Sequence, residues 1–134
     1  MDDITLRALK TLEAADAIIA EDTRTYRKLA ARHAIPSKPV YSLYKGNESA
    51  RVEQLLPMHA KAKSAAKVSE SGTPAVSDPG ALLVRRCLDA KIPVIPIPGP
   101  STLTAAMSVA GIFSWPVAFF GFLPKKKPAA AVIS

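Results

Sequence analysis

The sequence predicts an α/β fold, in which a mostly parallel sheet carries helices on both faces. Short apolar runs alternate with segments whose apolar residues recur at helical spacing, and this alternation is typical of parallel sheets. The 134 residues are 49% apolar, which is enough to bury one core. No apolar run approaches the ~18–20 residues that span a bilayer, so we expect no membrane partner.

The first third of the chain predicts helix, strand and helix in succession. Residues 4–14 carry apolar side chains at helical spacing, with Asp2 or Asp3 as candidate N-caps. Residues 17–20 are a short apolar run that stops at two acids, which predicts a buried strand. Residues 23–33 predict a basic helix. The chain therefore begins at a helix, although folds of this class usually begin with a strand.

The middle of the chain repeats the pattern. Residues 40–43 predict a second strand, and residues 48–59 predict a polar helix that Pro57 kinks or ends. Residues 65–68 predict a weak third strand. Residues 69–80 follow as a long loop that is rich in glycine and proline.

The last third predicts two further helices and two further strands. The helices are expected at residues 81–90 and 101–110, the second closed by Gly111. The strands are expected at residues 92–97 and 117–121. Two prolines in the first of these strands imply a free edge or a bend.

Ligands of open parallel sheets bind outside the carboxyl ends of the strands. The first loop expected there holds two acids and an arginine at residues 21–24. Asp22 or Thr23 could cap the following helix, and an exposed pair of Glu21 with Arg24 would contribute little stability. The structural and functional interpretations of this loop both remain open.

The long loop at residues 69–80 is the most informative of the three. Gly72 and Gly80 let the backbone approach a ligand, whereas Pro74 and Pro79 stiffen the path between them. Its hydroxyls come from Ser69, Ser71, Thr73 and Ser77. Such a loop suits a polar small molecule held by backbone groups. The alternative is that Ser77 and Asp78 only cap the next helix.

The third loop places Ser101 at a helix N-terminus after Pro-Gly-Pro. Free N–H groups at such a position attract carboxylates and phosphates. Ordinary capping explains the serine equally well.

The sequence lacks the motifs of several common enzyme classes. No dinucleotide-binding, phosphate-loop or serine-hydrolase motif is present, and His33 and His59 are isolated on predicted helices. The single cysteine, Cys87, makes no internal disulfide and is expected in the core, so we expect no metal site. The start lacks an export signal, which favours a cytoplasmic location. The net charge of +7 favours a polyanionic partner.

Several motifs, in this order, resemble the ribosomal RNA small subunit methyltransferase I family of the tetrapyrrole methylase superfamily. The matching segments are Asp-Ile-Thr-Leu-Arg-Ala-Leu at 3–9, Ala-Glu-Asp-Thr-Arg at 20–24, Ser-Gly-Thr-Pro at 71–74, Ser-Asp-Pro-Gly at 77–80, Ile-Pro-Ile-Pro-Gly-Pro-Ser at 95–101 and Gly-Phe-Leu-Pro at 121–124. They cover nearly the whole chain.

The resemblance implies transfer of a methyl group from S-adenosyl-L-methionine (SAM) to a cytidine ribose 2′-hydroxyl in small-subunit ribosomal RNA, on the RNA or the 30S subunit. Asp22 and Arg24 would face the RNA or the methyl-transfer centre. No residue is assigned as a general base. The residues that match the SAM-binding loops are Gly72, Thr73, Pro74, Ser77, Ser101 and Thr102.

The chain departs from the family pattern at two internal places and at both ends. Glu70 and Ser71 stand where the family has Asp-Ala, and residues 44–48 replace a segment that is often rich in histidine. The family's first strand and second domain are not matched. We therefore expect a partial SAM-binding domain at residues 1–124, a basic and apolar tail at residues 125–134, and an exposed sheet edge that favours a homodimer or a swapped assembly.

Three other hypotheses remain. A tetrapyrrole (corrin or porphyrin) methyltransferase of the same superfamily would use the same loops on a different substrate. A non-catalytic RNA-binding fragment would bind RNA in a salt-dependent manner without affinity for SAM. The 6% aromatic content offers little base stacking for this second hypothesis. The third is an inactive fragment.

Overall fold

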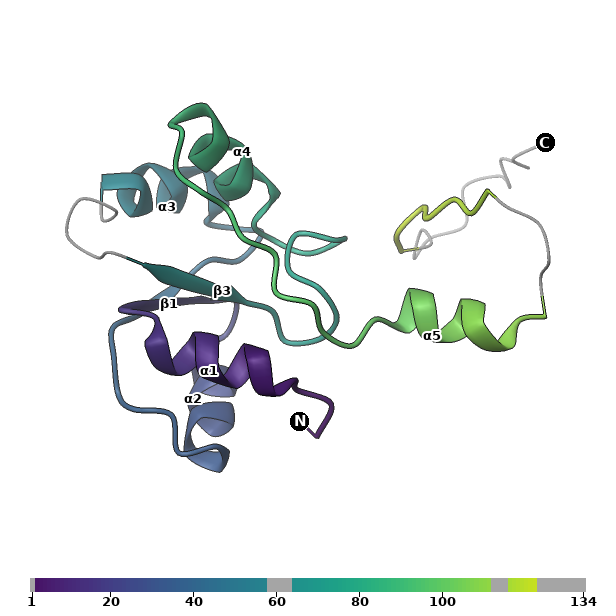
Figure 1. Ribbon diagram of the computed structural model, residues 1–134. Coiled ribbons are helices and arrows are strands. Elements are labelled where there is room, and N and C mark those ends of the chain that lie inside the picture. Colours follow the sequence, from purple (N-terminus) through teal and green to yellow (C-terminus); the bar gives the residue numbers. More distant parts are fainter. Residues whose placement is uncertain (1, 58–63, 112–115, 123–134) are drawn as a thin grey trace.

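The computed structural model describes residues 2–57, 64–111 and 116–122 and shows an α/β arrangement. Three parallel strands form one sheet, and helices cover both of its faces (Figure 1). The predicted fold class is therefore confirmed. In chain order the elements are α1 (Leu6–Ala14), β1 (Ala17–Ala20), α2 (Thr23–Arg32), β2 (Val40–Ser42), α3 (Glu48–Leu55), β3 (Ala65–Val68), α4 (Ala81–Asp89) and α5 (Thr102–Val109).

The central strand is β1, which pairs with β2 on one side and with β3 on the other. Its four residues are all buried, as expected for a strand covered on both faces. The side chains alternate: Ile18 and Ala20 pack towards the core that contains Leu12 and Tyr26, whereas Ile19 packs into a second core with Val52. The first core joins the sheet to α1 and α2, and the second joins it to α3 and α4.

The end of α1 is fixed by a lysine from a distant part of the chain. Lys38 Nζ donates hydrogen bonds to the main-chain oxygens of Leu12 at 2.6 Å, Glu13 at 2.8 Å and Ala15 at 2.7 Å. A cation suits these carbonyls because the C-terminal end of a helix is its negative end. The start of α1 corrects the sequence expectation: Thr5, and not Asp2 or Asp3, accepts the capping bond from the Ala8 amide at 3.1 Å.

Several element boundaries agree with the sequence to within a few residues. Helix α3 ends at Leu55, just before Pro57, as predicted. Gly111 follows α5 with a φ of +66°, which is the left-handed conformation expected after a helix. Cys87 is half-buried and packs against the second core. His59 and the tail at residues 125–134 lie outside the described residues.

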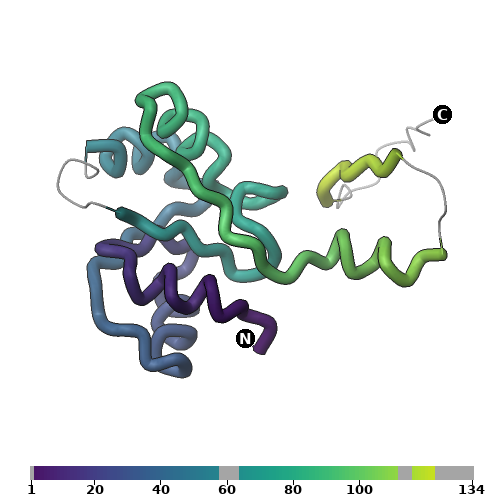
Figure 2. Tube along the Cα trace, viewed as in Figure 1, coloured from purple at the N-terminus to yellow at the C-terminus, as the bar shows by residue number. Residues whose placement is uncertain are grey.

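Two predicted strands are wrong. Residues 92–97 are extended but pair with no described strand, and residues 117–121 are also not a strand. Pro93 and Pro96 remove two backbone donors from the first segment, and Ile95 is 75% exposed there. Apolar character alone therefore predicted two strands, although neither segment pairs with a strand among the described residues. The first segment leads from α4 to α5, which extends away from the sheet and has no buried residue (Figure 2).

Candidate functional site

The three parallel strands end together at one edge of the sheet. Ala20 of β1 is in register with Ser42 of β2 and with Val68 of β3. The Leu43 amide donates to the Ala20 carbonyl at 2.8 Å, which continues the pairing one residue further. The loops that follow these strands therefore meet at the carboxyl edge, where open α/β sheets bind ligands.

The loop at residues 69–80 has an unusual backbone. Gly72 and Gly80 have φ angles of +72° and +124°, and the non-glycine residues Ala75 and Ser77 have +68° and +54°. Each such non-glycine residue costs on the order of 1 kcal/mol or more, and strain of this kind concentrates at ligand sites. Gly72 faces open space, because a Cβ built there would meet nothing within 4 Å. Thr73 is exposed beside it.

A partly buried ion pair connects this loop to β3. Lys67 Nζ lies 3.8 Å from Asp78 Oδ2, and both side chains are only 15% exposed. The same ammonium donates to the Val68 carbonyl at 2.8 Å. Burial lowers the pKa of Lys67, and the nearby carboxylates, chiefly Asp78 and Glu21, oppose that shift. Asp78 thus fixes the loop to the sheet. It does not cap α4, which corrects the capping alternative.

Glu21 belongs to the same group of charges. Its pKa is raised, first by burial, then by the neighbouring Asp78 carboxylate and by Glu70. The sequence placed Glu21 in a surface pair with Arg24, whereas in the structure Asp22 pairs with that arginine. Glu21 is therefore a site residue that sequence reasoning missed.

Glu48 performs the capping that Asp78 does not. Its Oε1 accepts hydrogen bonds from the amides of Gly80 at 2.9 Å and Leu82 at 3.2 Å, at the start of α4. The N-cap residue Gly80 has no side chain to do this. A carboxylate at this helix end is also favoured by the helix dipole. No local sequence signal marks this contact, because the partners are more than 30 residues apart.

Asp22 and Arg24 form one local unit at the start of α2. Asp22 accepts the Arg24 amide at 2.7 Å and its guanidinium at 3.1 Å, and these bonds lower the pKa of Asp22. The Arg24 side chain is 84% exposed. The capping interpretation of Asp22 is confirmed, and the guanidinium that it orients remains open to solvent.

The third predicted loop is less closely joined to the site. Ser101 is the N-cap of α5 but makes no side-chain capping bond, and Thr102 is exposed. Thr5 Oγ1 donates to the Pro98 carbonyl at 3.3 Å, which holds this loop to the start of α1. Among the described residues, no hydrogen bond joins Ser101 or Thr102 to the loop at 69–80.

The segment at residues 116–122 returns to the long loop. A Cβ on Gly121 would lie 2.7 Å from Ser77 Oγ, so a larger residue there would require the serine hydroxyl to move. The φ of +75° also favours glycine at this position. Ser77, predicted as a ligand residue, here packs against the chain itself. Within the described parts of the chain, no group of three or more potential ligand side chains could hold a metal ion. No described helix is long and apolar enough to cross a membrane.

Comparison with known proteins now adds to this geometry. Residues 1–114 match the family model described as tetrapyrrole (corrin/porphyrin) methylases. Proteins named ribosomal RNA small subunit methyltransferase I are similar over most of the chain. The Thermotoga maritima protein is 43% identical over 95% of this chain and 57% of its own length. The Xylella fastidiosa and Escherichia coli O157:H7 proteins are each 43% identical, over 96% and 92% of this chain and 47% and 43% of their own lengths. This chain thus spans about half the length of these relatives.

Proposed function

Since the chain belongs to the tetrapyrrole (corrin/porphyrin) methylase family, we propose that it binds SAM at the loop of residues 69–80 and serves as a methyltransferase domain. The acceptor would be a cytidine ribose 2′-hydroxyl of small-subunit ribosomal RNA. The observation that carries this proposal is an open, strained loop at the carboxyl edge of the sheet. The chain around it is 43% identical to a named ribosomal RNA methyltransferase.

The residues of this loop suit SAM. A nucleoside with an amino-acid tail needs backbone donors and acceptors within close reach, and Gly72 provides an approach with nothing within 4 Å of its Cβ position. Thr73 and Pro74 follow it directly, and Thr73 and Ser77 expose hydroxyl groups on the same loop. Ser101 and Thr102 would contribute free N–H groups at the start of α5. When bound, SAM supplies an activated methyl group on a sulfonium.

The protein's own part in the reaction is positioning. Lys67, Asp78 and Glu48 hold the loop, so that little ordering is needed when the ligand binds. Arg24, oriented by Asp22, would donate hydrogen bonds to an RNA phosphate, because a guanidinium forms strong bonds with phosphate oxygens. Alignment of the hydroxyl with the methyl group accounts for much of the rate in such transfers.

We further propose that two copies associate. Phe119, Phe120 and Phe122 are 53%, 73% and 87% exposed. Apolar surface of this kind marks an interface. The outer edge of β3 also has no strand partner in the described chain. The action proposed here, on ribosomal RNA, corresponds to a cytoplasmic location.

A tetrapyrrole acceptor is the second candidate, because the family model carries that description. The net charge of +7 suits either acceptor, because corrin precursors carry carboxylates and RNA carries phosphates. The 43% identity to a protein named ribosomal RNA small subunit methyltransferase I favours the RNA. The deciding assay follows a radiolabelled methyl group from SAM into unmethylated 30S subunits and, separately, into a corrin precursor. We expect label in the 30S subunits only.

The matched variants for that assay are Thr73→Tyr, which fills the open side of the loop, and Ser108→Tyr, which adds the same ring to the exposed end of α5. Thr73→Tyr should abolish labelling, whereas Ser108→Tyr should retain it. Labelling of the corrin precursor alone would overturn the RNA assignment. RNA binding without any affinity for SAM would identify the non-catalytic alternative.

A further inference from the structure

We propose that Tyr44 forms a stacking platform for an unpaired base of the RNA acceptor, with Lys45 and Lys28 holding the phosphates beside it. This inference rests on the proposed function, because it assigns a surface for the acceptor of the same site. It concerns a segment, residues 44–48, in which the sequence departs from the family pattern.

The Tyr44 ring is exposed on a fixed loop. The side chain follows the fully buried Leu43 directly, yet the residue is 48% exposed. Two bonds with Asn47 fix the backbone: the Tyr44 amide donates to Asn47 Oδ1 at 2.8 Å, and the Asn47 amide donates to the Tyr44 carbonyl at 3.0 Å. Arg51 Nε also donates to the Ser42 carbonyl at 3.2 Å. An aromatic ring on such a loop loses little freedom when a base stacks on it.

Gly46 determines where the ring lies. A Cβ built on Gly46 would lie 2.8 Å from Tyr44 Cε2 and 3.4 Å from Cδ2. The ring therefore rests against the glycine backbone, a contact that no other residue allows without moving the ring. Gly46 does not have a positive φ, so its backbone would accept alanine. The glycine thus serves the placement of the ring and not a turn conformation.

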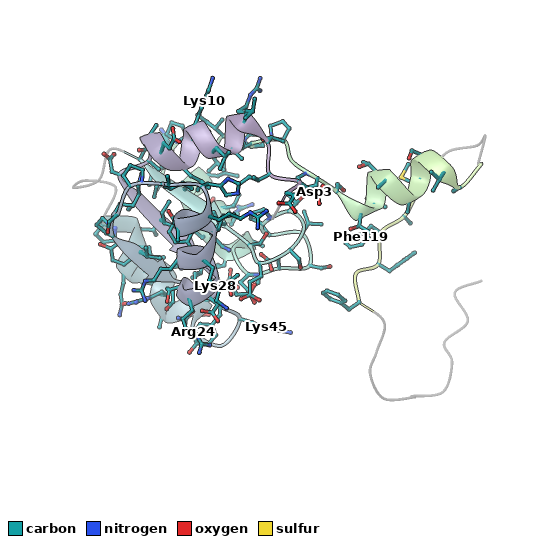
Figure 3. All side chains as sticks on the ribbon, turned by 90° about the horizontal axis from the view of Figure 1, so that it is seen from below. Asp3, Lys10, Arg24, Lys28, Lys45 and Phe119 are labelled. Carbon is teal, nitrogen blue, oxygen red and sulfur yellow. The ribbon has the colours of Figure 1, made fainter. Side chains whose placement is uncertain are left out.

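Lys45 follows Tyr44 in the chain, and two other cations lie at the same end of the molecule (Figure 3). Because β1 and β2 are parallel and in register, the loop at 43–47 and the start of α2 leave the sheet at the same edge. Figure 3 shows Lys45, Lys28 and Arg24 gathered at one end of the molecule, with Lys10 on the opposite side. Arg24 is paired with Asp22, but among the described ion pairs none includes Lys28 or Lys45. Both side chains are exposed, so phosphates can reach them.

An exposed ring followed directly by a lysine, with further cations at the same end of the molecule (Figure 3), fits single-stranded RNA. Proteins bind unpaired nucleotides by stacking bases on aromatic side chains and by holding the backbone with cations. A duplex would offer the ring no base face. The platform also stands at the edge where the methyl donor is proposed to bind, so it would hold a nucleotide close to the reacting one.

The test measures binding of a fluorescein-labelled single-stranded oligocytidylate of about 12 nucleotides by fluorescence anisotropy. We expect Tyr44→Ala to weaken binding about 10-fold and Tyr44→Phe to change it less than about twofold, because the phenyl ring still stacks. Tyr44→Leu, which keeps the bulk but not the flat ring, should resemble Tyr44→Ala. Gly46→Ala should weaken binding in the parent chain and have no further effect in the Tyr44→Ala background.

Salt dependence separates the ring from the lysines. Lys45→Gln should reduce the slope of log Kd against log salt by about one, whereas Tyr44→Ala should leave the slope unchanged. Lys10→Gln, on the opposite side, should change neither affinity nor slope.

Three results would overturn the platform: no measurable affinity of the parent chain for the oligonucleotide, an effect of Tyr44→Ala below about twofold, or equal losses for Tyr44→Phe and Tyr44→Ala. Calorimetry with SAM on the same variants keeps the two proposals apart. RNA binding that depends on Tyr44, together with no SAM affinity in this chain or in one extended to the length of its relatives, would support the platform and contradict the methyltransferase proposal. SAM binding in a chain whose RNA affinity does not depend on Tyr44 would support the methyltransferase proposal and contradict the platform.

Discussion

The contact of Glu48 with the start of α4 can be tested by removing its carboxylate. In Glu48→Ala, the amides of Gly80 and Leu82 lose the acceptor that lies 2.9 Å and 3.2 Å away. Gly80 is buried, so water replaces the carboxylate there only in part. Loss of one helix cap costs about 0.5–2 kcal/mol, and here two bonds to a charged acceptor are lost together. We expect the free energy of unfolding to fall by about 2 kcal/mol, which corresponds to about 7 °C in Tm.

The matched control is Glu53→Ala, on the same helix. Glu53 also reaches α4, through Arg86 at 2.9 Å, but these side chains are 60% and 50% exposed. An exposed ion pair contributes about 0.5 kcal/mol or less. Urea unfolding followed by circular dichroism measures both variants. Equal losses for Glu48→Ala and Glu53→Ala would refute the argument that burial and capping distinguish the two glutamates.

Two further predictions concern stability. Lys38→Met should lower the free energy of unfolding by about 2–3 kcal/mol, because three main-chain oxygens at the end of α1 lose a charged donor; urea unfolding should show no comparable loss for the exposed Lys10→Met, and equal losses would contradict the reasoning. The pKa of Glu21 is raised in the folded chain above its ordinary value of 4.5. The unfolded chain therefore releases this proton at lower pH than the folded chain does. Because of this difference, the free energy of unfolding falls as the pH rises above about 4.5. Glu21→Gln should therefore gain stability relative to the parent between pH 4 and 7, and a difference independent of pH would exclude this role.

The sequence predicted the three strands of the sheet and the helices that cover its faces. Residues 17–20 are apolar and bounded by acids, and they became the buried central strand at those same residues. The failures share a physical cause. Residues 92–97 are apolar enough for a strand, but pairing depends on an available partner edge, and periodicity says nothing about that edge.

The candidate site was predictable only in part. Glycine, proline and length singled out the loop at 69–80, because these features act locally on the backbone. The contacts that fix the loop depend on residues far away in the chain: Glu48 reaches Gly80, and Lys67 reaches Asp78. Local capping rules suggested Asp78 for the helix start, but Lys67 holds its carboxylate elsewhere. The same limit applies to Tyr44, whose exposure and contact with Gly46 appear only in the folded chain.

The most direct test of the central claim is a calorimetric titration of this chain with SAM, repeated with Thr73→Tyr and with the control Ser108→Tyr. Binding of SAM by the parent and by Ser108→Tyr, together with its loss in Thr73→Tyr, is the predicted result. Unfolding midpoints of the three proteins should agree, because both substituted positions are exposed. SAM binding that Thr73→Tyr leaves intact would contradict the assignment of the loop. Absence of SAM binding both in this chain and in one extended to the length of its relatives would contradict the proposed function.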